Sequence, residues 1–268
     1  RSNLFFEPGF ADGRNTNRWI LVNNSLWNNW VSPNILRFNR RWGNHGISTF
    51  VGYEAQKTTN TGNASEASNL LPGLDQLEDA SKPESVSSVA STNSLTGIFL
   101  NNSYDYKQKY YLTASIRRDA SSRFGNQKRS AAFWSLGTAW NIYREPVLQD
   151  VSVINELRIR ASYGSNGNQA IENYASLSLY SPGNDYDGKP GYVLTQYPNS
   201  YLTWEQNRPF NIGLDFALLK NRLSGTIEYY NRKTSRLLLN VPVSSANGIT
   251  TVFRNNGEMK NSGVEISL

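Results

Sequence analysis

Residues 110–119 read Tyr110-Tyr111-Leu112-Thr113-Ala114-Ser115-Ile116-Arg117-Arg118-Asp119, and their alternation decides the fold class. Every second residue from Tyr110 to Ile116 is apolar or aromatic, whereas the set that begins at Tyr111 ends in Arg117 and Asp119. Side chains of a strand have a period of two, so the two sets lie on opposite faces, while a helix would mix them. The segment predicts a strand with one dry face and one strongly polar face.

The same alternation recurs before and after this segment, and it predicts an all-β, antiparallel, up-and-down sheet. Strands are expected at 18–31, 34–42, 47–57, 94–106, 109–120, 132–143, 155–165, 201–217, 222–236, 250–259 and 262–268. The number is ten or eleven, because Pro33 either separates two strands or kinks one.

The connections between these strands tend to alternate in length. Four are short, at 43–46, 107–108, 218–221 and 260–261. The others are intermediate or long, at 58–93, 121–131, 144–154, 166–200 and 237–249. Tight turns at one end and elaborate loops at the other are typical of transmembrane β-barrels, as are aromatic residues near the strand ends. A soluble sandwich or propeller is the alternative, but several strands here exceed the usual ~5–6 residues and no blade repeat is found.

Composition excludes several classes of protein. The chain has 268 residues with no Cys and one His, so cysteine-stapled scaffolds and Cys-bearing metal sites are excluded. Its 27 Lys+Arg exceed its 21 Asp+Glu, but the basic residues never form a run of five, so we expect no nucleic-acid partner. No stretch reaches the ~18–20 apolar residues of a membrane helix, whereas a barrel strand needs only ~9–11 alternating ones. The first residues are not a signal peptide.

The residues that could carry catalysis are few. His45 is alone in its turn, and Gly164-Ser165-Asn166-Gly167 lacks the third glycine of a dinucleotide site. The carboxylates could include a glycosidase pair, but most lie on polar strand faces beside Arg or Lys, where ion pairing is the simpler role. We therefore expect no enzyme, no catalytic residue, no metal and no cofactor.

The polar strand faces are expected to line a hydrated lumen, because opposite charges can pair there across neighbouring strands. The candidate lumen residues are Arg117, Asp119, Arg158, Arg160, Asp215 and Glu228. The residues expected to face lipid are Leu112, Ile116, Leu157, Ile159, Ile212, Leu214 and Phe216. The long segment 166–200 carries tyrosines among Asn, Asp, Ser and Gly, a composition suited to binding sugars or peptides. The candidate contacts are Tyr174, Tyr180, Tyr186, Tyr192 and Tyr197, although an ordinary surface loop is the alternative.

Six motifs, in order along the chain, resemble SusC/RagA-type TonB-dependent outer-membrane transporters. The first runs from Arg117 through Asp119 to Gly125, and the second from Leu157 through Tyr163 to Gln169. The remaining four lie at 202–205, 211–215, 229–234 and 256–265. The motif residues are Arg117, Asp119, Ser121, Ser122, Arg123, Phe124, Tyr163, Gly164, Gly167, Asn168, Gln169, Trp204, Glu205, Asn211, Gly213, Asp215, Asn256, Gly257, Asn261, Gly263 and Glu265. Ala120 stands where the family usually has Gly.

The resemblance implies import of oligosaccharides or peptides across the outer membrane of a Gram-negative bacterium. It also implies a multi-pass barrel in outer-membrane lipid, a SusD-like surface lipoprotein, and TonB acting through an N-terminal region not present here. Family barrels have about 22 strands and a plug, so residues 1–268 are expected to form part of one barrel domain, roughly the middle half of its wall, without the plug and the remaining strands. A passive porin or adhesion barrel is the alternative, and an outer-membrane hydrolase is third.

Overall fold

The computed structural model describes residues 2–6, 18–71, 73–148 and 151–268. Ten strands form its main sheet: β1 (Ser2–Phe6), β2 (Trp19–Trp42), β3 (His45–Leu70), β4 (Ala80–Tyr106), β5 (Tyr110–Ser121), β6 (Ser130–Asn141), β7 (Ile154–Asn168), β10 (Glu205–Leu218), β11 (Leu223–Ser235) and β14 (Glu258–Ser267). Two small sheets pair β8 (Leu179–Pro182) with β9 (Tyr192–Gln196), and β12 (Leu238–Pro242) with β13 (Thr251–Asn255). Short 3-10 turns are η1 (Leu77–Asp79), η2 (Ile142–Arg144), η3 (Pro146–Leu148) and η4 (Ser245–Asn247).

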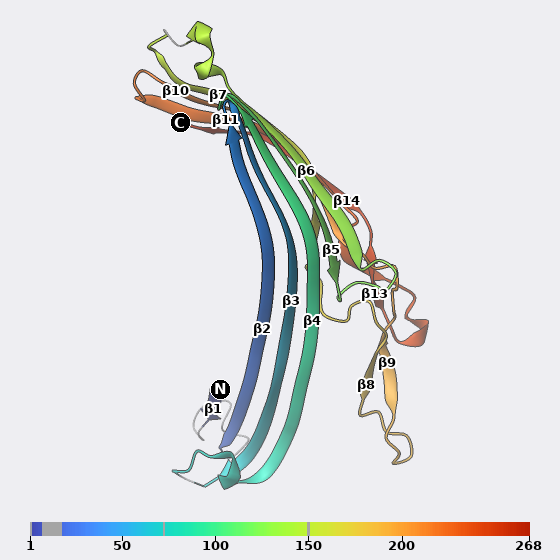
Figure 1. Cartoon of the computed structure of the whole chain (residues 1–268). Helices are drawn as coiled ribbons and strands as arrows, with labels where there is room; N and C mark the ends of the chain where they lie inside the picture. The colour runs from blue at the N-terminus through green and yellow to red at the C-terminus, as the bar shows by residue number, and fades with distance from the viewer. Residues whose placement is uncertain (1, 7–17, 72, 149–150) are drawn as a thin grey trace. The chain divides into compact units, whose positions relative to one another are not determined.

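The main sheet is an antiparallel meander, as predicted. Its order is β1-β2-β3-β4-β5-β6-β7-β10-β11-β14, so strands that follow each other in the chain lie next to each other in the sheet (Figure 1). The sheet is not closed, since β14 pairs only with β11 among the described residues. The small sheets β8–β9 and β12–β13 interrupt the connections that follow β7 and β11.

The chain divides into two compact units, and long strands run through both. The first unit contains Arg1–Val31 and Gln56–Ser94. Its buried apolar residues are Ile20, Ala67 and Leu70. Polar contacts join its strands: the Ser68 hydroxyl donates to Glu84 at 2.5 Å, and Gln56 and Thr58 both donate to the Asn29 side chain.

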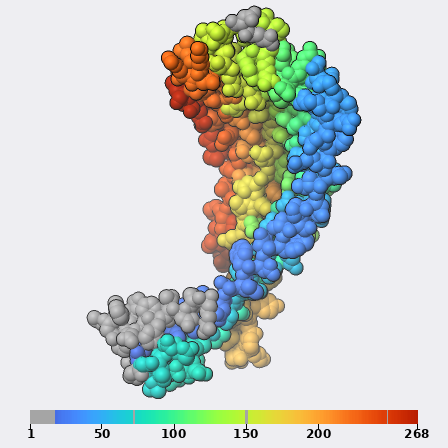
Figure 2. Space-filling model, turned by 60° about the vertical axis from the view of Figure 1, so that its left-hand side comes forward, coloured from blue at the N-terminus to red at the C-terminus, as the bar shows by residue number. Residues whose placement is uncertain are grey.

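The second unit contains Ser32–Ala55 and Leu95–Leu268, and its strands appear as neighbouring bands in chain order (Figure 2). Cross-strand pairing places Ile116 opposite Leu100 and Trp134 on one face, and Arg117 opposite Phe99 and Phe133 on the other. Exposed apolar side chains follow the first face from β4 to β14: Ile98, Leu100, Leu112, Ile116, Trp134, Leu136, Ile159, Ile212, Ile227, Val264 and Ile266. We call this the apolar face, and the other the polar face.

Several strand boundaries differ from the prediction. The expected long loop at 58–93 is instead the end of β3 and the start of β4, joined around η1. Segments 18–31 and 34–42 form the single strand β2. At Pro33 this strand lacks a partner on one side within the described residues, because β1 pairs only with Trp19–Asn23, and an edge tolerates a residue without an N–H.

The C-terminal boundaries also differ. Lys260 and Asn261 were expected to form a turn between strands at 250–259 and 262–268, but they lie inside β14, paired with Lys233 and Arg232. The turn is at Asn256-Gly257, where Gly257 has a φ of 82°. Strand 201–217 begins only at Glu205, and β1, β8, β9 and β12 were not predicted.

Candidate functional site

Arg160 on β7 holds together three neighbouring strands of the polar face. Its Nε lies 3.2 Å from Oδ2 of Asp215 on β10, and its Nη2 lies 2.5 Å from Oε2 of Glu228 on β11. The second contact crosses over Gly213, the residue of β10 that pairs with both Arg160 and Glu228. A Cβ at Gly213 would come within 3.0 Å of the Arg160 guanidinium, so glycine leaves the space for this crossing. Thr226 adds a hydrogen bond to Asp215 at 3.0 Å.

Arg117 on β5 forms a matching cluster. Its Nε lies 2.6 Å from Oδ1 of Asp119, and its Nη2 lies 3.4 Å from Oε2 of Glu54 on β3. Its guanidinium also lies over the Phe99 ring of β4, 5.2 Å from the centroid. Each arginine thus faces two carboxylates, and a row of paired charges follows the polar face. Such pairs are compatible with water and incompatible with lipid.

Arg158, the sixth residue expected in the lumen, shares this face, although it forms no ion pair with any described residue. It lies opposite Asp215 in the pairing of β7 with β10, and its guanidinium lies 5.8 Å from the centroid of the Tyr111 ring. The structure thus brings the six candidates to one face as two clusters and one arginine stacked on an aromatic ring. The residues expected to face lipid all lie on the opposite face.

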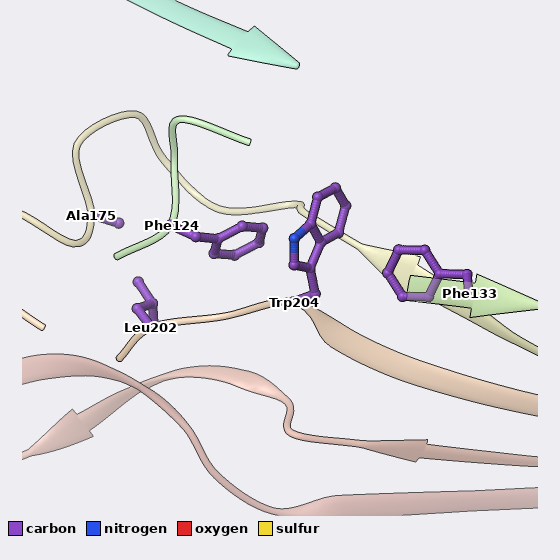
Figure 3. Packing of buried hydrophobic residues seen from close by; sticks show 5 residues of the cluster. All are labelled: Phe124, Phe133, Ala175, Leu202 and Trp204. Carbon is purple, nitrogen blue, oxygen red and sulfur yellow. The ribbon is translucent and has the colours of Figure 1, made fainter. Parts of the chain in front are cut away.

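The largest buried apolar cluster of the second unit gathers loop residues against the polar face. Phe124, Ala175, Leu202 and Trp204 pack together, and Phe133 of β6 lies against the Trp204 ring at 5.5 Å between centroids (Figure 3). Phe124 and Leu202 are fully buried. We call this set the loop core. It ties the connection after β5 to the long connection before β10.

Hydrogen bonds fix the loop core to its surroundings. The Trp204 indole N–H donates to the Arg129 carbonyl oxygen at 2.8 Å, and the backbone N–H of Thr203 donates to Oδ1 of Asn255 at 2.8 Å. The backbone N–H of Gly125 donates to the Leu202 carbonyl oxygen at 3.0 Å. A Cβ at Gly125 would collide with the Ser200 carbonyl oxygen, so glycine is required for the close approach of the two chain segments.

Many of the motif residues identified in the sequence prove to build this assembly. Arg123 donates from Nε to Oδ1 of Asn173 at 3.0 Å and from Nη1 to the Gln169 carbonyl oxygen at 3.2 Å. The Asn168 amide donates to Glu205 at 3.2 Å. Their structural role is to hold loop segments distant in sequence against one another. Most of the other motif residues lie in the strands, where Asp215 and Arg117 belong to the charge clusters, whereas Asn256 and Gly257 form the turn before β14.

The five candidate tyrosines fall into three environments. Tyr180 and Tyr192 lie on the β8–β9 hairpin with their rings 5.4 Å apart and edge to face, and Tyr186 lies near the tip, 86% exposed. Tyr174 is half-buried at the base of the segment, where its carbonyl oxygen accepts a hydrogen bond from the Gln196 amide.

Tyr197 lines a concavity of about 700 Å³ between the long connection and the β12–β13 sheet. Tyr201, Asn199 and Arg254 line it as well. The Arg254 side chain has no ion pair or hydrogen bond with any described residue. Sequence reasoning missed Tyr201 and Arg254, because no local signal shows that residues about 50 positions apart share one hollow.

The short-turn end carries a different cluster. Ring contacts connect Tyr106 to Tyr110 and Tyr110 to Trp140, with centroids 6.4 and 6.2 Å apart. The carboxylate of Glu145, in the connection after β6, accepts hydrogen bonds from the Tyr110 hydroxyl at 2.7 Å, the Trp140 indole at 3.1 Å and the Lys109 ammonium at 3.2 Å. These donors, led by Tyr110, hold the pKa of Glu145 below its ordinary value. Aromatic rings with polar tips are typical of a membrane interface.

Among the described residues, no group of three or more His, Cys, Asp or Glu side chains could hold a metal ion. None of the helices in the described ranges is long and apolar enough to cross a membrane.

The whole chain, residues 1–268, matches the family described as TonB dependent receptor-like, beta-barrel. The chain belongs to this family. Its members are outer-membrane barrel proteins, so this receptor chain is part of an outer-membrane β-barrel. The named relatives are receptors or transporters.

Two curated relatives show the degree of similarity. TonB-dependent receptor P3 of Formosa agariphila is 35% identical over 246 residues, which are 90% of this chain and 25% of the relative. TonB-dependent receptor SusC of Bacteroides thetaiotaomicron is 36% identical over 188 residues, 67% of this chain and 19% of SusC. The chain thus spans about a quarter or less of the length of these relatives.

Solved structures show the same fold. A chain of the RagAB peptide transporter superposes with a TM-score of 0.84 at 26% identity, covering 93% of this chain and 28% of that one. The ferric citrate transporter FecA matches with a TM-score of 0.54 at 9% identity, which shows a shared fold alone. The predicted SusC/RagA-type resemblance and the barrel fold class are therefore confirmed.

Proposed function

We propose that this chain forms part of the wall and loops of a SusC-like, TonB-dependent importer of oligosaccharides or peptides. The observation that carries the proposal is the pairing of a charge-compensated polar face with a continuous exposed apolar face on one sheet. Such a wall separates lipid from a hydrated passage, and the lumen side is the one that bears Arg117 and Arg160. The chain acts as a transporter rather than an enzyme.

We also propose the partners of the whole protein. Similarity to SusC and to a chain of the RagAB peptide transporter supports a SusD-like surface lipoprotein at the long-connection end and TonB at the other. Residues 1–268 belong to one barrel domain, and the complete protein supplies a plug and the remaining strands.

Substrate contacts are assigned to the loops. The concavity of Tyr197, Tyr201 and Arg254 offers two aromatic rings and a guanidinium in one hollow, which suits a sugar ring or a peptide with an acidic group. The exposed Tyr180, Tyr186 and Tyr192 of the β8–β9 hairpin offer further stacking surfaces.

Uptake by the complete receptor tests the transport proposal. Cells that express it are given labelled oligosaccharides or labelled peptides, with and without TonB. Uptake of one class that disappears without TonB is expected. Uptake that persists without TonB would support a passive porin instead, and hydrolysis of a probe by the purified receptor would support an enzyme.

A matched pair of variants tests the loop contacts. Arg254→Gln removes the cation of the concavity, and Arg222→Gln removes an exposed arginine beside the turn between β10 and β11. We expect the apparent KM for the accepted probe to rise in Arg254→Gln alone. Equal uptake by both variants would show that the concavity does not contact substrate.

A further inference from the structure

Three cations lie side by side on the apolar face at its long-connection end. Cross-strand pairing places Arg208 of β10 opposite Lys233 of β11, and Lys233 opposite Lys260 of β14. Directly opposed residues of an antiparallel pair have Cβ atoms about 5 Å apart. We call these three residues the cation row. All three are exposed.

The cation row is only partly compensated by its surroundings. Glu258 pairs with Lys233 at 2.7 Å, and Arg208 donates to the neutral amide oxygen of Gln206 at 3.1 Å. The Lys260 side chain has no ion pair or hydrogen bond with any described residue. Like charges directly opposite each other destabilise a sheet, so a surplus of three cations over one carboxylate favours an external anion.

This arrangement contrasts with the charge clusters of the polar face. There, Arg117 and Arg160 each meet two carboxylates of the same chain. On the apolar face, only one of the three cations meets a carboxylate, so the remaining positive charge can be balanced by an anion outside the chain.

The cation row lies at the boundary of the apolar face. Along β10 the next residues on this face are Phe210 and Ile212, and along β14 Ser262 lies level with Phe210 and is followed by Val264 and Ile266. The row therefore lies one step beyond the last aromatic position, toward the long connections. In a barrel wall this is the level of the lipid headgroups.

A surface concavity of about 550 Å³ is lined both by the cation row and by aromatic residues of the apolar face. The three cations line one part, and Tyr163, Phe210 and Asn231 line another. Apolar rings next to cationic groups form an amphipathic hollow, and the matching ligand carries a phosphate next to hydrocarbon.

We propose that the cation row and its concavity bind the phosphate-bearing headgroup of an outer-leaflet lipid. The guanidinium and ammonium groups contact the phosphate, and the acyl chains lie along Phe210 and the apolar residues behind it. Because the cation row adjoins the apolar face, a lipid fits this site better than a soluble phosphate does. The inference rests on the proposed function for two assignments: the apolar face to lipid, and the long-connection end to the outer leaflet.

Binding of a defined lipid to the purified complete receptor tests the proposal. The probes are bisphosphorylated lipid A, chemically dephosphorylated lipid A and inorganic phosphate. Because each basic residue at an anionic lipid surface adds to affinity, we expect the phosphorylated lipid to bind about tenfold or more tightly than its dephosphorylated form. The variant Arg208→Gln/Lys233→Gln/Lys260→Gln should lose this preference.

The matched control removes the same charge at the short-turn end, with Lys107→Gln/Lys220→Gln/Arg222→Gln, and should keep the preference. Equal affinity of the wild-type receptor for both lipids, or an unchanged preference in the cation-row variant, would overturn the proposal. The proposal would also be overturned if the receptor bound inorganic phosphate at the cation row but bound phosphorylated and dephosphorylated lipid A equally well. If the triple variant fails to insert, Lys260→Gln alone should reduce the preference about threefold.

Uptake measurements separate this proposal from the transport function. A cation-row variant that loses lipid preference and still imports the labelled probe supports the lipid site. A wild-type receptor that shows the lipid preference but imports neither class of labelled probe would count against the transport proposal alone.

Discussion

The two faces of the second unit reverse the usual arrangement of a water-soluble protein. On the apolar face, residues such as Ile116 and Val264 are 55% and 62% exposed. On the polar face lie the paired charges and, at one end, the buried loop core. A sheet in water would bury the first face and expose the second.

The difference shows how each face is stabilised. The apolar face contributes stability only when hydrocarbon covers it, because its side chains have no protein layer against them in the described chain. The polar face is stabilised from within, by ion pairs between strands and by loops that fold back onto it. Substitutions on the two faces should therefore change stability by very different amounts. These changes can be measured in the complete receptor in its membrane.

The largest effect is expected from the loop core. Trp204→Ala removes a 5% exposed indole and leaves the Arg129 carbonyl oxygen without its donor. Truncating a buried aromatic costs about 3–5 kcal/mol, so local opening of residues 122–129 and 199–204 should become far more frequent. Hydrogen exchange of these segments measures it. Tyr201→Ala, three residues away and 63% exposed, should leave the exchange rates nearly unchanged; equal acceleration in both variants would contradict a buried loop core.

The faces are compared most directly by one substitution at two adjacent residues of β4. Leu100→Arg places a charge on the apolar face, at a cost of about 2–4 kcal/mol near mid-depth. Asn101→Arg places it on the polar face, and a change of less than about 1 kcal/mol is expected there. Unfolding in denaturant from lipid bilayers provides the free energies. Similar losses at both positions would remove the distinction between the faces.

The charge cluster of Arg160 should contribute less to stability than the loop core or the apolar face does. Its side chain is 36% exposed and those of Asp215 and Glu228 are 23% and 22% exposed, so water screens the pairs. Arg160→Gln should cost about 1 kcal/mol, and a double-mutant cycle with Glu228→Gln should give a coupling of about 0.5–1 kcal/mol. A coupling of zero would show that the contact to Glu228 does not stabilise the wall.

The smallest effect concerns pH at the short-turn end. The pKa of Glu145 is lowered in the folded state, chiefly by the Tyr110 hydroxyl and then by the Trp140 indole. A carboxylate with a lowered pKa stabilises the fold above its unfolded pKa, and this contribution disappears as the pH falls through the folded pKa. The fluorescence of Trp140 should therefore change at acid pH in the wild-type receptor but not in Glu145→Gln. A transition that persists in the variant would assign it to another group.

The sequence predicted those parts of the fold in which one face is apolar and the other polar. In β5 the alternation from Tyr110 to Asp119 located the strand, which runs from Tyr110 to Ser121. The alternation did not predict the strands within residues 58–93, because Thr, Asn and Ser fill both faces there and the pattern resembles a loop. There, side-chain hydrogen bonds such as Ser68 to Glu84 add to the backbone pairing of β3 with β4.

The candidate site was predictable only in part. Alternation alone assigned Arg160, Asp215 and Glu228 to one face, but it could not show that Gly213 allows Arg160 to reach across a strand. The loop core joins residues about 75 positions apart, such as Trp204 and Arg129, and such contacts depend on tertiary structure. The motif residue Phe124 was recognised by resemblance, while its buried packing role became visible only in the fold.

Accessibility along β5 tests the central claim most directly. The chain contains no cysteine, so single cysteines can be introduced at residues 111–117 of the complete receptor, after removal of any cysteines elsewhere, and then labelled in bilayers. We predict that Leu112, Ala114 and Ile116 react with a lipid-soluble reagent, and that Tyr111, Thr113, Ser115 and Arg117 react with a water-soluble one. Reversed labelling, or labelling that does not alternate, would contradict a wall with its apolar face in lipid and its charge clusters in water.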